Sequence, residues 1–230
     1  MPTEKEVYAA HADQYERLIL REDHENNIPA AVRKIKDFAG IDVVELGAGT
    51  GRLTRFLVRE AASVAASDIS HHMLSTARGL LPTGKNPNLT ICAADMRHTP
   101  LAANCADLVI AGWSFCYLAV WGEKAWRETL KPGLREIERL IRPGGAVVLL
   151  ENYGTGFEEP QPPVHLDPYF SYLKNAGFQH SWIRTDYKFR DLEEALELSN
   201  FFFGADLSAK VKENAWEILP ECTGVLWKNY

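Results

Sequence analysis

The residues with the most informative chemical spacing are three glycines that follow a short apolar run. Residues 43–46 have the composition of a buried strand, and Gly47, Gly49 and Gly51 then stand at every second position. Because glycine has no Cβ, its backbone can turn sharply and approach a ligand closely. Apolar residues recur at helical spacing from 53 to 57, and the N-terminal N–H groups of such a helix would face the same ligand. Strand, glycine loop and helix predict the nucleotide-binding corner of a doubly wound α/β sheet.

The position of the glycines separates two kinds of nucleotide ligand. A dinucleotide loop has the spacing Gly-x-Gly-x-x-Gly, which would require a glycine where the chain has Arg52. The chain has Gly-x-Gly-x-Gly instead, with the acid Glu45 two residues ahead of it. This pattern resembles the first motif of class I S-adenosylmethionine-dependent methyltransferases. The resemblance implies that the cofactor is bound by Glu45, Gly47, Ala48, Gly49, Thr50 and Gly51.

A second acid lies at the end of the next predicted strand. Residues 62–67 are small and apolar and lead into Asp68, and Ser70 is suited to cap the helix that follows. Asp68 comes about twenty residues after the glycine loop, where a strand-end carboxylate can accept hydrogen bonds from both ribose hydroxyls. In the family that this segment resembles, the acid holds the ribose and the next side chains flank adenine. That implies contacts from Ile69 and Met73.

Three further segments match the same family in the expected order. Residues 89–94 form a predicted strand before Asp95 and Met96, which the resemblance places at the adenine ring. Residues 106–113 resemble the fourth strand, which would bring Gly112 and Trp113 beneath the reactive methyl group. Residues 140–150 match the family's helix, Pro-Gly-Gly turn and fifth strand. The resemblance therefore extends from about residue 41 to residue 151.

The elements that position these residues predict one α/β domain with a seven-stranded, mostly parallel sheet. The resemblance implies the strand order 3-2-1-4-5-7-6, with strand 7 (222–228) antiparallel beside a long strand 6 (178–189). We expect two short helices between 121 and 141, separated at Pro132, because proline is tolerated in a first helical turn. We divide the domain into a helical cap (1–40), a cofactor-binding core (41–151) and C-terminal strands (152–230) with a helical insertion at 190–219.

The cap and the insertion are the candidates for binding a methyl acceptor. The first of two expected leading helices carries Tyr8, His11 and Tyr15 at helical spacing. They form one wall of the acceptor pocket, with Tyr15 also at the cofactor, or they pack on the core. The insertion carries three consecutive phenylalanines, which cover the pocket unless their helix is buried on two sides. We select as acceptor-side candidates His11, Tyr117, Tyr153 and Phe202, with Glu151 and His165 also placed suitably; each could instead be structural.

Composition excludes several classes of function. The chain has 230 residues and a formal net charge of -6, with no basic run of the kind that binds a nucleic-acid backbone. Four scattered cysteines have no metal-ligand spacing, Cys116 is expected to pack, and adjacent helical residues such as His71 and His72 point apart. Residues 1–6 do not resemble a signal peptide, and no apolar run has the length of a membrane span. We expect a cytoplasmic protein without metal, nucleic-acid or membrane partners.

These observations predict an S-adenosylmethionine-dependent methyltransferase that acts at O or N of a small molecule. Methyl transfer requires alignment of a lone pair with the methyl group, so these enzymes often share no catalytic set, and we assign no catalytic residue. Two alternatives stay open. The chain could be a cofactor-binding sensor or partner subunit, or it could transfer a different group from the same cofactor. The acceptor and the oligomeric state are not defined by these patterns.

Overall fold

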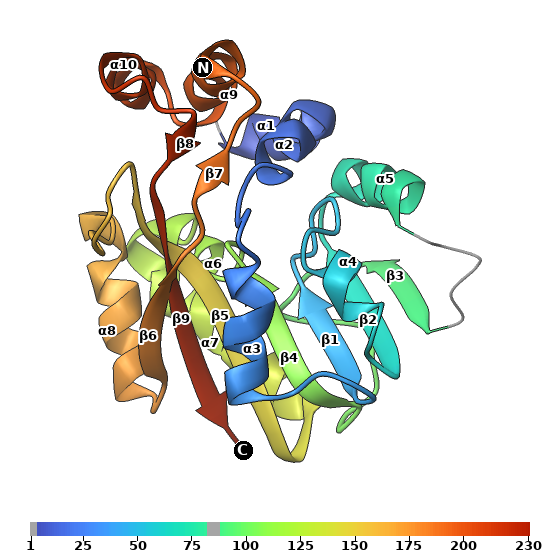
Figure 1. Cartoon of the computed structure of the whole chain (residues 1–230). Helices are drawn as coiled ribbons and strands as arrows, with labels where there is room; N and C mark the ends of the chain where they lie inside the picture. Colours follow the sequence, from blue (N-terminus) through green and yellow to red (C-terminus); the bar gives the residue numbers. More distant parts are fainter. Residues whose placement is uncertain (1–3, 82–87) are drawn as a thin grey trace.

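The computed structural model describes residues 4–81 and 88–230, so Met1–Thr3, part of the segment tested for a signal peptide, lies outside it. A seven-stranded sheet has the order β3-β2-β1-β4-β5-β9-β6 (Figure 1). β9 pairs antiparallel with β5 and β6, whereas β1 to β5 pair in parallel. This confirms the predicted strand order, with β9 as the seventh strand. The strands are β1 (Asp42–Leu46), β2 (Ser63–Asp68), β3 (Leu89–Ala93), β4 (Ala106–Gly112), β5 (Ile141–Thr155), β6 (Gln179–Arg184) and β9 (Glu221–Asn229).

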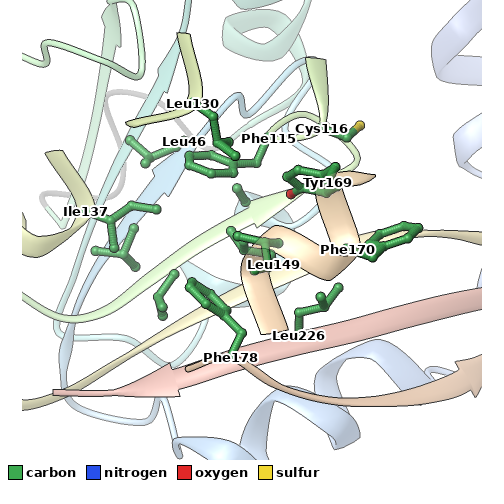
Figure 2. Close-up of a cluster of buried hydrophobic side chains, with 14 of the residues drawn as sticks. Leu46, Phe115, Cys116, Leu130, Ile137, Leu149, Tyr169, Phe170, Phe178 and Leu226 are labelled. Atoms are coloured by element: carbon green, nitrogen blue, oxygen red, sulfur yellow. The ribbon is translucent and has the colours of Figure 1, made fainter. Parts of the chain in front are cut away.

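Helices cover both faces of this sheet because its central strands are apolar on both sides. In β5, Val147 and Leu149 pack in one cluster with α7 (Trp126–Leu140) and α8 (Asp167–Asn175). Figure 2 shows part of that cluster, with Leu149 between the side chains of Phe178 and Tyr169. The alternate residues Val148 and Leu150 pack on the other face with α3 (Asn27–Ile35) and α4 (Thr54–Leu57).

The chain forms a single helix where we expected two around Pro132. α7 continues through this proline, after a 3-10 turn at Glu123–Ala125 and the short α6 (Tyr117–Val120). An interior proline costs about 3 kcal/mol. Leu130 and Ile137, on either side of it, are fully buried, and each such side chain contributes about 1.5–3 kcal/mol. Packing of the apolar face therefore outweighs the lost hydrogen bond.

The leading segment also differs from the prediction, because it forms three helices: α1 (Glu4–Ala10), α2 (Ala12–Ile19) and α3. The break lies at His11, and α5 (His71–Leu80) satisfies the backbone groups on both sides of it. Ala12 N donates to His72 Nε2 (3.3 Å), and Ser70 Oγ donates to the Tyr8 carbonyl (2.8 Å). As predicted, Ser70 caps α5, and its hydroxyl accepts from the Met73 N–H.

The predicted long sixth strand is interrupted. β6 ends at Arg184, and β7 (Tyr187–Lys188) pairs with β8 (Ile218–Leu219) in a separate two-stranded sheet. Asp186 stabilises the break, because its carboxylate accepts from the Arg184 guanidinium and from the Glu221 N–H. Between β7 and β8 the chain forms α9 (Leu192–Phe202) and α10 (Ala205–Glu213).

These C-terminal helices and the leading helices lie together at one end of the sheet. In Figure 1, α1, α2, α9 and α10 gather above the carboxyl ends of the parallel strands. Three of them, α2, α9 and α10, share an apolar cluster in which Leu18 of α2 packs with Tyr187, Leu198 and Val211. Ligands bind at the carboxyl ends of parallel strands in such sheets. The leading helices and the C-terminal helices are therefore placed to cover a ligand.

Candidate functional site

A cavity of about 260 Å³ lies at the carboxyl ends of β1, β2, β3 and β4, beneath α1 and α2. We call it the first cavity. It brings together ten of the fourteen residues that the sequence assigned to the cofactor. These are Tyr15, Gly47, Gly49, Asp68, Ile69, Met73, Asp95, Met96, Gly112 and Trp113.

The glycine loop has the backbone that only glycine adopts easily. Gly47, Gly49 and Gly51 have φ of 71°, 57° and 91°. A Cβ on Gly47 would lie 2.4 Å from Ser114 Oγ, whereas one on Gly49 would lie 3.4 Å from Met73 Cε. Gly47 is therefore required by the neighbouring β4 loop, and Gly49 is the position at which the loop surface stays open to the cavity.

Asp68 ties the glycine loop to the start of α5. One carboxylate oxygen accepts from the Gly49 N–H (2.8 Å) and the other from the Ser70 N–H (2.7 Å). Burial raises the pKa of Asp68, and these N–H groups oppose the rise because they stabilise the charged form. The Ile69 N–H also stabilises this carboxylate, which lines the cavity.

Asp95 also lines the first cavity, and Arg97 holds its carboxylate in place. Its carboxylate accepts from the Arg97 Nε at 2.9 Å and from the Arg97 backbone N–H at 2.9 Å. These hydrogen bonds from Arg97 lower the pKa of Asp95, so it presents a charged carboxylate.

The other four predicted cofactor residues lie behind the cavity wall. Glu45 is buried and accepts a hydrogen bond from the Thr54 hydroxyl, and burial raises its pKa to about 8. A Cβ on Gly51 would meet Leu81 Cδ1 at 2.7 Å. Leu81 directly follows α5, so Gly51 allows the end of α5 to approach the glycine loop. The residues that do not line the first cavity are Glu45, Ala48, Thr50 and Gly51.

A second cavity, also of about 260 Å³, adjoins the first and shares Tyr8, Tyr15, Trp113 and Tyr117 with it. Trp113 stands between the two, directly after β4, with its backbone N–H bonded to the Leu150 carbonyl (2.7 Å). Its φ of 48° is in the left-handed region, which costs a non-glycine residue about 1–2 kcal/mol. This strain aims the Trp113 side chain at the junction of the cavities.

The wall of the second cavity contains buried charges. Arg52 Nη1 pairs with Glu22 Oε2 at 2.7 Å, and the guanidinium carbon lies 3.6 Å from the centroid of the Trp113 ring. Glu151 and Glu221 are 0% and 1% exposed. Burial raises the pKa of Glu151 to about 7 and that of Glu221 well above its usual range.

The acceptor-side candidates are distributed unevenly. Tyr117 lines both cavities, and its hydroxyl lies 2.9 Å from that of Tyr8. Phe202 lines the second cavity, as do Glu151 and His165. His11 lines neither cavity and its ring contacts Phe201 at 6.0 Å between centroids. Tyr153 also lines neither; it is buried against Phe170 and the backbone of Gly224.

Sequence reasoning missed five polar residues of the second cavity. They are Glu22, Arg52, Asn152, Tyr187 and Glu221. The position of Arg52, directly after Gly51, indicated that its side chain could lie near the site. In the sequence it argued only against a dinucleotide ligand. Among the described residues, no group of three His, Cys, Asp or Glu side chains is arranged to hold a metal ion. None of the described helices combines the length and the apolar character needed to cross a bilayer.

Known proteins resemble this chain at the residues that surround the first cavity. Residues 44–149 match the family model of a methyltransferase domain. A demethylmenaquinone methyltransferase of Corynebacterium kroppenstedtii is 31% identical over 147 residues, which cover 64% of this chain and 55% of that protein. A malonyl-[acyl-carrier protein] O-methyltransferase of Pectobacterium atrosepticum is 32% identical over 47% of this chain and 38% of that protein. The chain thus matches about half or less of the length of these two relatives.

Solved structures agree with the observed topology. A SAM-dependent methyltransferase from Aquifex aeolicus has a TM-score of 0.59 at 16% identity, covering 93% of this chain and 97% of that one. The architecture is the Rossmann-like fold of class I S-adenosylmethionine-dependent methyltransferases. Residues 44–149 are thus similar to a methyltransferase domain, and the whole chain shares its fold with solved methyltransferases.

Proposed function

We propose that this protein is an S-adenosylmethionine-dependent methyltransferase. The cofactor occupies the first cavity, and a small acceptor in the second cavity receives the methyl group at O or N. One observation carries the proposal: the glycine loop, Asp68 and Asp95 line one cavity, and Trp113 joins it to a second cavity with a polar wall. The family match and the names of the relatives support the same reaction class.

The residues of the first cavity fit this cofactor. Asp68 accepts from the backbone at Gly49 and Ser70, and its carboxylate lines the cavity, where a ribose would present two hydroxyl donors to it. Ile69 and Met73 supply apolar surface beside the adenine, and Asp95 offers an acceptor for an adenine amino group. We propose that Tyr15, Gly112 and Trp113 surround the methionine portion.

The cofactor supplies an electrophilic methyl group on a sulfonium centre. The protein's contribution is to hold the acceptor atom in line with that methyl group and to exclude water. Proximity and orientation of this kind can lower a barrier by about 7–11 kcal/mol. Tyr15 and Tyr117 line both cavities with Trp113, so we place the transfer between these three rings.

The remaining predictions from the sequence complete the proposal. We propose that residues 4–35 and the insertion from α9 to α10 act as the cover of the acceptor cavity within one domain. We also propose that the protein works in the cytoplasm on a free small molecule, without a nucleic-acid partner.

Calorimetry with S-adenosylmethionine and its demethylated product tests cofactor binding. Asp68→Ala removes two hydrogen bonds to a charged group, each contributing about 1.5–3 kcal/mol, so we expect affinity to fall at least tenfold. Asp206→Ala, at an exposed position of α10, is the matched control and should bind as the wild type does. Unchanged affinity in Asp68→Ala would remove this residue from the site.

Incubation with methyl-labelled cofactor and a metabolite extract then tests turnover. Transfer of label to a small molecule supports an enzyme. Tight cofactor binding with no transfer from any extract would favour the sensor or partner-subunit alternative. Transfer of a labelled group other than methyl, followed with cofactor labelled in its aminocarboxypropyl portion, would favour the second alternative.

A further inference from the structure

The second cavity combines buried acids with aromatic walls, a combination that suits positively charged ligands. We propose that its acceptor carries a protonated nitrogen, an amine held by Glu151 and Glu221 against the aromatic wall. This inference rests on the proposed function and narrows the acceptor from O or N to the nitrogen of a cationic amine.

One carboxylate oxygen of Glu151 has no hydrogen-bond donor among the described residues. Its Oε1 accepts from the Tyr169 hydroxyl (2.7 Å) and from the Cys116 N–H (3.1 Å). Its Oε2 is buried and has no hydrogen-bond partner among the described residues, although the side chain lines the cavity. A buried acceptor without a partner is costly, so Glu151 Oε2 marks a position for a ligand N–H.

Glu221 presents the same feature on the neighbouring strand β9. The side chain is buried, lines the cavity, and has an Oε2 without a partner in the described part of the chain. Among the described residues of this wall, Arg52 is the one Arg or Lys, and it is paired with Glu22. Arg52 also acts on Glu221 electrostatically, but one arginine stands against three acids of this wall, Glu22, Glu151 and Glu221, which leaves Glu151 and Glu221 without a cation of their own.

The aromatic wall favours a cation independently of the acids. Tyr15, Trp113, Tyr187 and Phe202 line this cavity, and the faces of aromatic rings attract positive charge. Trp113 already holds the Arg52 guanidinium at 3.6 Å from its ring centroid. The wall thus accommodates one cation of the protein, and it offers further ring surface beside the two unmatched acids.

Other acceptor classes fit this wall less well. A carboxylate or phosphate would add negative charge beside Glu22, Glu151 and Glu221 in a buried setting, where like charges repel strongly. A neutral alcohol can donate one hydrogen bond but leaves the charge of the acids unmatched. An ammonium group supplies up to three donors and the opposite charge.

The position of Glu151 also provides for the proton that an ammonium must lose. Leu150 and Gly112 are the last residues paired between β5 and β4, and Trp113 N donates to the Leu150 carbonyl. Glu151, the next residue of β5, therefore lies close along the chain to the partner of Trp113, which stands at the junction of the cavities. The ammonium proton passes to the Glu151 carboxylate. The freed lone pair then forms the nitrogen–carbon bond while the carbon–sulfur electron pair remains on sulfur, which leaves as a thioether. Burial raises the pKa of Glu151 to about 7, which suits a base near neutral pH.

Binding to protein saturated with S-adenosylhomocysteine tests the inference without turnover. The probes are matched sets on common skeletons: benzylamine, benzyl alcohol and benzoate; 2-phenylethylamine, 2-phenylethanol and phenylacetate; butylamine, butanol and butyrate. At pH 8 we expect at least one amine to bind at least tenfold more tightly than its alcohol and carboxylate partners. Tighter binding of an alcohol or carboxylate, or no binding of any amine, would overturn the inference.

Two substitutions locate the binding. Glu151→Gln and Glu221→Gln keep the side-chain shape and should each weaken the bound amine at least tenfold, with S-adenosylhomocysteine affinity unchanged. Glu213→Gln, exposed on α10, should have no effect. Amine binding that survives both substitutions in folded protein would refute the site. If the wild type does not bind S-adenosylhomocysteine, the proposed function is refuted instead. Failure of the amine inference can therefore be distinguished from failure of the proposed function.

The pH dependence supplies a second readout. The groups that face Glu151 are Cys116, Tyr153 and Tyr169, and those that face Glu221 are Glu22, Arg52, Asp186 and Tyr187. Since burial raises the pKa of Glu151 to about 7, this carboxyl loses its proton between pH 6 and pH 8, and amine affinity should rise over that range. Affinity that is constant over this range would contradict binding by Glu151.

Discussion

Gly47 and Gly49 have similar backbones and different surroundings, so alanine at the two positions should have different effects. Both residues have positive φ, which costs an alanine about 1–2 kcal/mol. At Gly49 the new Cβ would make ordinary contact with Met73 Cε at 3.4 Å. At Gly47 it would overlap Ser114 Oγ and Cβ at 2.4 and 2.5 Å, which adds about 1–3 kcal/mol of overpacking. Gly47→Ala should therefore be the less stable protein.

Urea unfolding and cofactor calorimetry separate the two effects. We expect Gly49→Ala to lose about 1–2 kcal/mol and to lose cofactor affinity, because its Cβ enters the first cavity. Gly47→Ala should lose about 2–5 kcal/mol in total, and adding Ser114→Gly should recover the overpacking part. If Gly47→Ala is no less stable than Gly49→Ala, or if Ser114→Gly restores nothing, the contact with Ser114 does not explain this glycine.

Three further predictions concern ligand choice, the cap and stability. Thermal shifts should show stabilisation by S-adenosylmethionine but not by NAD or NADP, because Arg52 stands at the third glycine of a dinucleotide loop and is held by Glu22; stabilisation by NAD alone would refute the assignment. Phe202→Ala should weaken amine binding in the second cavity and leave cofactor affinity within about threefold, because Phe202 lines the second cavity and not the first. Equal losses would place Phe202 in the cofactor site. Burial disfavours the charge of Glu136, but hydrogen bonds from Arg139 and Thr99 outweigh burial and lower its pKa to about 2. Glu136→Gln should therefore lower the free energy of unfolding by about 2–3 kcal/mol at pH 7. The stabilisation by Glu136 is present above its unfolded pKa and disappears as pH falls toward 2. The control Glu128→Gln, on the exposed face of the same helix, should have little effect on stability at either pH.

The sheet order was predicted from the family resemblance, and the residues of the first cavity could be predicted because the motifs that carry this resemblance are local in sequence. Each motif is a strand followed within a few residues by the glycine or acid that it positions, and β1 to β5 follow one another along the chain. The continuity of α7 and the break after β6 depend on tertiary contacts. Leu130 and Ile137 are buried by the sheet, and Asp186 bonds to Glu221 of another strand. No local pattern contains those partners.

The second cavity was only partly predictable for the same reason. Glu22 follows α2, Glu221 begins β9, and Arg52 belongs to the glycine loop, so their association requires the cap to fold back over the strand ends. Arg52 shows how one position serves both cavities. Its backbone continues the glycine loop of the first cavity, while its guanidinium pairs with Glu22 and stacks on Trp113. The residue that we expect to exclude a dinucleotide therefore also forms part of the wall of the second cavity, so the proposed cofactor loop and the proposed acceptor wall are two sides of the same turn.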